Sequence, residues 1–220
     1  MQAGTFVISP TETEKILGGH LHQSLQWNHH LQGSKTSLLR QLTSRINGLK
    51  RISRNATFQT RLMVANGVVM SKLVYLVTLW GGAQQYLLKA LLVQQLAAAR
   101  AVCGFNAWGW SKRKLLDKVN WLSVRQLIYY HTVLQTHKTL SSGLPRSLCA
   151  AFPRVYPYNT RNSTTGKIRC DESFRSTATF KFRSMSCYNS LPANVMEGSL
   201  SSVKKKLKAW VHSNVPVDWG

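Results

Sequence analysis

The chain has 220 residues, of which 44% are hydrophobic, so it is long and apolar enough to bury a core in one large or two modest domains. It carries 29 Lys and Arg against seven Asp and Glu, a net charge of +22, which predicts nucleic acid or an anionic membrane surface as its partner. The seven acids are mostly scattered singly, which excludes the clustered carboxylates of a two-metal polymerase or nuclease site.

The N-terminal half is predicted to be a short β-hairpin followed by three helices. Residues 5–8 and 15–21 have the composition of strands, with a turn at 10–13. Apolar residues at helical spacing predict a first helix over 33–52. A second helix should begin with Asn55 as its N-cap and stop at Gly81-Gly82, and a third should run from Gln84 to Cys103 and end at Gly104.

The second half is predicted to be less regular. Helices are expected over 111–119 and over 123–140, the latter capped by Ser123. Residues 150–176 are rich in Pro, Ser, Thr, Asn and Arg and should form loops with short strands, and a final amphipathic helix is expected over 200–212. The predicted fold is mainly α, with a short N-terminal β-hairpin and an irregular α/β C-terminal segment.

The charge is distributed unevenly along the chain. From Lys15 to Leu116 there are fourteen Lys and Arg and no Asp or Glu. A folded segment of this kind repels itself unless a polyanion supplies the missing charge, and phosphate contacts dominate protein affinity for nucleic acid. The residues that we predict to contact phosphates are, first, Lys35, Arg40, Arg45, Lys50, Arg51, Arg54 and Arg61 and, second, Lys112, Arg113 and Lys114.

Other chemistry is weakly indicated. His20 and His22 should share one strand face, but no nearby acid or cysteine completes a metal site, and no nucleophile motif or phosphate-binding glycine loop occurs. The four cysteines form no CxxC pair and are predicted to be reduced structural thiols. Trp80 and Trp121 are predicted to anchor helix junctions, whereas Trp108 and Trp110, beside a basic run, could instead stack on bases.

No targeting or membrane-spanning segment is predicted. The first ten residues lack a basic region followed by a long apolar run, so we expect an intracellular protein, nuclear or cytoplasmic, that is not secreted. The apolar stretch 62–83 is interrupted by Asn66, Ser71 and Lys72, which favours a buried core helix over a membrane span.

Several short motifs, read in order, resemble one family. Glu14-Lys-Ile-Leu-Gly18 and Leu25-Gln-Trp-Asn-His-His30 come first, followed by Ser71-Lys-Leu-Val-Tyr75, Trp80-Gly81, and Leu92-Val-Gln94 with Ala99-Arg100. Leu115-Leu116 with Trp121-Leu-Ser-Val124, and Arg161-Asn162 with the stretch from Phe180 to Tyr188-Asn-Ser-Leu-Pro192, complete the series. This order and spacing, over about residues 5–210, resembles the C-terminal part of LINE-type (non-LTR) retrotransposon reverse transcriptases, with Tyr188 where the family usually has Trp.

The resemblance implies an organisation and a function. Residues 1–30 would be the end of the palm, 31–148 a helical thumb-like domain, and 149–220 a basic, loop-rich segment with a final amphipathic helix. A thumb grips template–primer duplex, so the expected partners are RNA or an RNA–DNA duplex and a palm-bearing polymerase chain. The family's metal-binding palm motif is absent from the sequence, so no catalytic residue, cofactor or metal is expected in this chain, and Mg²⁺ would belong to the palm.

Two alternatives stay open. The chain could be a basic scaffold or membrane-surface protein that uses 62–83 and the Lys204–Lys208 run, or a degenerate retrotransposon remnant with no selected role.

Overall fold

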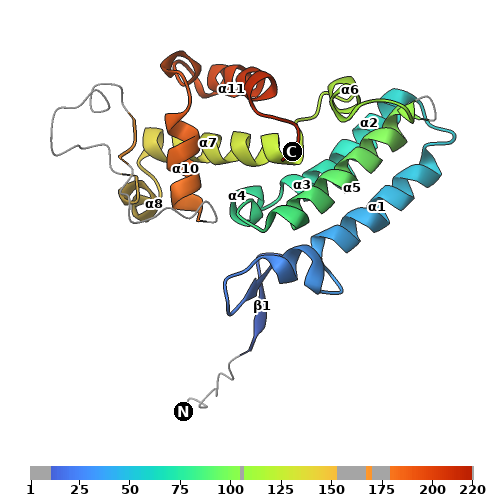
Figure 1. Cartoon of the computed structure of the whole chain (residues 1–220), viewed down its shortest axis with the longest axis horizontal. Coiled ribbons are helices and arrows are strands. Elements are labelled where there is room, and N and C mark those ends of the chain that lie inside the picture. The colour runs from blue at the N-terminus through green and yellow to red at the C-terminus, as the bar shows by residue number, and fades with distance from the viewer. Residues whose placement is uncertain (1–10, 105–106, 153–166, 170–178, 220) are drawn as a thin grey trace, which may run out of the picture.

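The structure is a computed structural model, and it describes residues 11–104, 107–152, 167–169 and 179–219. It is mainly α with one small β-hairpin, as the sequence predicts (Figure 1). The hairpin lies at one extremity, beside the start of helix α1 (Leu38–Ile52). Helices α2 (Phe58–Ala65), α3 (Ser71–Val74) and α5 (Gln85–Cys103) pack with α1 into one group, whereas α4 (Val77–Trp80) packs on α7 (Val124–Ser142).

A second group of helices, which includes α4, forms around α7, whereas the short helix that leads into α7 packs on α5. Helix α6 (Lys112–Lys118) leads from α5 into α7, and α8 (Arg146–Ala150), α10 (Phe180–Asn189) and α11 (Leu200–Asn214) follow, with a 3₁₀ turn at Ala193–Val195 (Figure 1). One continuous core joins the two groups and extends from Leu31 to Val215. A smaller cluster of Phe152, Ile168 and Met185 lies apart from it.

The hairpin differs from the prediction. The predicted strand at 15–21 is split into β1 (Thr13–Ile16) and β2 (Gly19–His22), which pair antiparallel with Ile16 opposite Gly19. Leu17 and Gly18 form the turn with φ of 48° and 79°, and two consecutive positive φ values make the turn type that matches the twist of a two-residue hairpin. The predicted strand at 5–8 lies outside the described residues.

The first predicted helix begins later than expected. A π-helical turn at His29–Gly33 precedes α1, which starts after Ser37, so 34–37 are not helical. Leu38, Leu42, Ile46 and Leu49 are buried, which confirms the predicted apolar stripe.

The second predicted helix, from Asn55 to Gly81, is wrong as a single element. Thr57, not Asn55, caps its start, because the Thr57 side chain accepts from the backbone N–H of Thr60. A π-helical turn at Asn66–Met70 follows α2. The helix breaks at Tyr75 because the Tyr75 carbonyl accepts from the Trp80 indole N–H at 2.9 Å instead of a backbone N–H, and Leu76 takes a positive φ of 58°.

The later helices agree more closely with the sequence. Gly104 ends α5, Ser111 caps α6, and Ser123 caps α7 in a capping box with Gln126. Helix α11 runs from Leu200 to Asn214, two residues beyond its predicted end. Most of the predicted loop region 150–176 lies outside the described residues.

Candidate nucleic-acid interface

The face of α1 turned away from the core carries cationic and neutral polar side chains, with Leu39 at its edge. At 3.6 residues per turn, Arg40, Asn47 and Arg51 fall within about 40° of one another, opposite the buried leucines. Thr43 and Ser44 lie on the same face, and a shallow depression runs along it. The lining residues of the depression are Gln32, Ser37, Leu39, Arg40, Thr43, Ser44 and Asn47.

Most cations of the first predicted group lie on or beside this face. Arg40, Lys50 and Arg51 are exposed on α1, Lys35 precedes the helix, and Arg54 follows it. In the part of the chain that the structure describes, none of these five side chains has a carboxylate within 4.0 Å. We call these five residues the α1 cation face.

Arg45 and Arg61 are placed differently from the other predicted cations. Arg45 Nη1 donates to the carbonyl of Val68 at 2.7 Å and so ties α1 to the π-helical turn. Arg61 lies against Gly104, where an added Cβ would come within 3.2 Å of Arg61 Nη1. Its Nε is buried without a hydrogen-bond partner. Both guanidinium groups are therefore partly occupied in packing.

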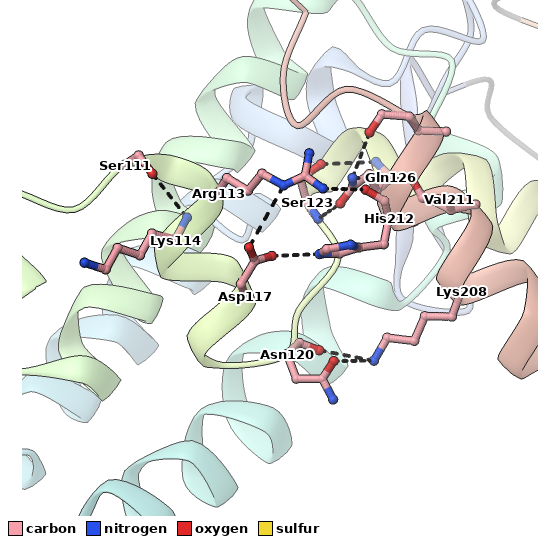
Figure 2. A network of polar contacts seen from close by, with 11 residues as sticks. Ser111, Arg113, Lys114, Asp117, Asn120, Ser123, Gln126, Lys208, Val211 and His212 are labelled. Atoms are coloured by element: carbon pink, nitrogen blue, oxygen red, sulfur yellow. Dashed lines mark hydrogen bonds and ion pairs between the residues drawn. The ribbon is translucent and has the colours of Figure 1, made fainter.

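The second predicted group lies at the contact between α6 and the C-terminal region (Figure 2). Lys112 Nζ lies 2.5 Å from a carboxylate oxygen of Asp218. Arg113 Nε lies 4.0 Å from Asp117, and its Nη2 donates to the carbonyl of His212 at 3.2 Å. Lys114 Nζ lies over the ring of Trp110, 4.8 Å from its centroid. Lys112 and Arg113 thus have acidic neighbours, unlike the α1 cation face.

The α6–α11 contact holds the C-terminal helix in place. His212 Nε2 and Asp117 Oδ1 are 2.7 Å apart, and Lys208 Nζ donates to the carbonyl and side-chain oxygens of Asn120 (Figure 2). Gln126 Nε2 donates to the carbonyl of Val215 at 2.8 Å. Sequence reasoning missed this contact; its one local signal was the Ser-x-x-Gln capping box, which places Gln126 in the first turn of α7.

The apolar side of α11 is occupied. Val203, Leu207 and Val211 are buried in the core, so α11 offers no free apolar face to a membrane surface while it stays docked. The stretch 62–83 is divided among several short helices. Among the described helices only α5 is long and apolar enough to cross a bilayer, and half of its hydrophobic window is buried inside the protein, as in a core helix.

Four histidines pack the hairpin against the start of α1. The rings of His22 and His29 stack with centroids 5.0 Å apart, and His20 Nε2 lies 2.9 Å from the hydroxyl oxygen of Thr36. Burial lowers the pKa of His30 to about 4, and the nearby positive charge of His20 and Lys72 adds to the effect. Within the described ranges no group of three or more His, Cys, Asp or Glu side chains could hold a metal ion.

The tryptophans divide into buried anchors and one exposed ring. Trp80 and Trp121 are buried, and the Trp121 indole N–H donates to the side-chain oxygen of Asn66 at 2.8 Å, which confirms both as anchors of helix junctions. Trp110 is partly buried beneath Lys114. Trp108 is 77% exposed, so its ring faces solvent.

Residues of the resembling motifs recur at junctions between elements. The Tyr75 hydroxyl donates to the carbonyl of Leu17 at 2.5 Å and so ties the end of α3 to the hairpin turn. Gly81 packs so closely on Ile128 of α7 that an added Cβ would lie 2.7 Å from its Cγ2. These positions have a structural role in this fold whatever its function.

Comparisons with models of known protein families, with curated proteins and with solved structures find no match.

Proposed function

We propose that the chain binds a nucleic-acid duplex through the α1 cation face. The observation that carries the proposal is the set of five cations on and beside one helix, with no carboxylate partner in the described part of the chain. Exposed cations on a self-compensated surface are normally interspersed with acids. Because no acid of the described residues neutralises these five cations, an external polyanion is attracted to their positive charge.

The spacing of the arginines suits a phosphate backbone. Arg40 and Arg51 are eleven positions apart, which is about 17 Å along the helix axis. Measured along the axis of a B-form duplex, at 3.4 Å per nucleotide of one strand, that length is roughly five nucleotides, so the two arginines are too far apart to share one phosphate. The neutral groups between them, from Thr43, Ser44 and Asn47, are of the kind that bonds to phosphate and sugar oxygens.

Binding through phosphate and sugar contacts does not depend on the nucleotide sequence of the duplex. The resemblance to non-LTR retrotransposon reverse transcriptases makes the duplex a template–primer RNA–DNA hybrid and makes the chain the binding part of an RNA-directed DNA polymerase, inactive without a palm-bearing chain. A helix face made of donors can follow the backbone of such a hybrid without reading base edges.

The test measures the binding of a fluorescent 20-base-pair RNA–DNA hybrid by anisotropy between 50 and 200 mM salt. In the double variant R40Q/R51Q we expect weaker binding to all sequences, and a slope of log K against log salt that is smaller in magnitude by about 2. K204Q/K205Q is the matched control, because it removes the same charge from exposed residues of α11 and should change the slope little.

Equal effects of the two double variants would refute the proposal, because binding would then follow net charge rather than the α1 cation face. Affinity that does not change with salt would refute it as well. Binding to vesicles of anionic lipid but not to the hybrid would favour the membrane-surface alternative.

A further inference from the structure

A second binding site is indicated at the junction of the two helix groups. A pocket with a volume of about 630 Å³ lies between the α4–α5 connection, α7, α10, α11 and the segment that follows α11. This volume is within the usual range for small-molecule sites, about 300–1,000 Å³. Its described lining contains two arginines, Arg125 and Arg183, and no acidic residue.

The arginines enter the pocket from different helices. Arg183 of α10 is only 8% exposed, and its Nη2 donates to the carbonyl of Thr78 at 2.6 Å. Burial lowers the pKa of this guanidinium, which reflects the cost of holding its charge away from water. Arg125 of α7 donates from Nη1 to the backbone carbonyl of Asp218 at 2.5 Å. An anion in the pocket would give the partly buried guanidinium of Arg125 a charged partner.

The same pocket is lined by aromatic rings. Tyr129 and Trp210 stack with centroids 5.6 Å apart and an interplanar angle of 30°. Trp219 lines it from the C-terminal segment, and its carbonyl accepts from Gln85 Nε2 at 3.4 Å. Both tryptophans are only partly buried, so part of each ring stays accessible. Aromatic rings of this kind stack on nucleobases, with about 1–3 kcal/mol per base.

The thiol of Cys187 also lines the pocket, and it takes no part in the binding. Burial raises the pKa of the Cys187 thiol to about 11, so it stays protonated and is a poor nucleophile near neutral pH. Binding without covalent chemistry is therefore what the pocket supports.

We propose that this pocket binds a nucleoside monophosphate group, with the base against Trp210 or Trp219 and the phosphate at Arg125. Arginine binds phosphate through its fork of N–H donors, and the adjacent rings add selectivity for a flat base. The group belongs either to a free nucleotide or to the terminal nucleotide of a single strand. No residue of the α1 cation face lines the pocket, so the site goes beyond duplex binding and either proposal can fail alone.

The test is titration calorimetry of the whole chain with adenosine monophosphate, adenosine and inorganic phosphate. We expect the monophosphate to bind at least about tenfold more tightly than either part alone, because it uses both the rings and Arg125. W219L should weaken the monophosphate about fivefold or more, the loss of one stacking contact. W108L is the matched control: it removes an exposed tryptophan outside the pocket lining and should change nothing.

A second variant keeps the result interpretable if W219L disturbs the fold. R125Q retains a donor for the Asp218 carbonyl and should weaken the monophosphate while leaving adenosine binding unchanged. Competition by a short 5′-phosphorylated single strand that exceeds the monophosphate in affinity assigns the site to a strand terminus, and weaker competition assigns it to a free nucleotide.

The proposal is overturned if the monophosphate binds no better than phosphate alone, or if W219L and W108L behave alike. Binding of the hybrid by the same samples tests the α1 cation face separately.

Discussion

Replacement of Gly81 by alanine tests the packing of α4 against α7. A Cβ on Gly81 would lie 2.7 Å from both the Val77 carbonyl oxygen and Ile128 Cγ2, well inside ordinary van der Waals contact. Because Gly81 is buried at the end of α4 with φ −61° and ψ −10°, the backbone itself accepts alanine. The cost is therefore one of overpacking alone, about 1–3 kcal/mol.

Part of that cost is offset. Alanine loses less backbone entropy on folding than glycine, which contributes about 0.4–1 kcal/mol. With the middle value of each range, about 2 kcal/mol of overpacking less about 0.7 kcal/mol of entropy, the net loss expected for G81A is about 1.3 kcal/mol. At about 2–4 °C per kcal/mol for a chain of this length, the thermal midpoint should fall by roughly 3–5 °C.

The variant G48A is a control that should change the stability in the opposite direction. Gly48 lies inside α1, and a Cβ there would meet nothing within 4 Å. G48A should therefore stabilise the protein by about 0.5–1 kcal/mol through helix propensity. Urea denaturation followed by far-ultraviolet circular dichroism measures both variants at one salt concentration. A midpoint for G81A that is unchanged or raised, beside a raised midpoint for G48A, would refute the packing argument.

Two further predictions concern pH and the α6–α11 contact. The folded pKa of His30, about 4, is below its unfolded value of 6.5, so His30 contributes stability that is present above pH 6.5 and is lost, by up to about 3 kcal/mol, as the pH falls to 4. Burial lowers the pKa of His131 in the same way, so both histidines contribute to the loss of stability at low pH. In urea midpoints measured between pH 7 and 4, H30Q should therefore remove about half of this loss. An unchanged loss would contradict the role assigned to His30. In the anisotropy assay, K112Q/R113Q should lower the affinity for the hybrid less than R40Q/R51Q does, because Asp218 and Asp117 already partly neutralise Lys112 and Arg113. A larger effect of K112Q/R113Q would contradict this prediction.

The sequence by itself determined the helical character and much of the element order. The apolar repeat of Leu38, Leu42 and Ile46 predicted the buried side of α1, and Ser123 marked the start of α7. These features are local, because side-chain spacing and a capping hydroxyl act within one or two turns. The acid-free run from Lys15 to Leu116 likewise identified the cations now found on α1.

Only the tertiary structure decided which cations have an acidic neighbour among the described residues and which do not. Asp117 and Asp218 are distant in the sequence from His212 and Lys112, respectively, yet the folded chain brings each pair together. The break of the second helix at Tyr75 likewise depends on a carbonyl taken by Trp80 and a hydroxyl bonded to Leu17. The pocket between Arg125 and Arg183 joins α7 to α10 and left no pattern in the sequence. Such contacts depend on where separate elements meet, which residue spacing within one element does not encode.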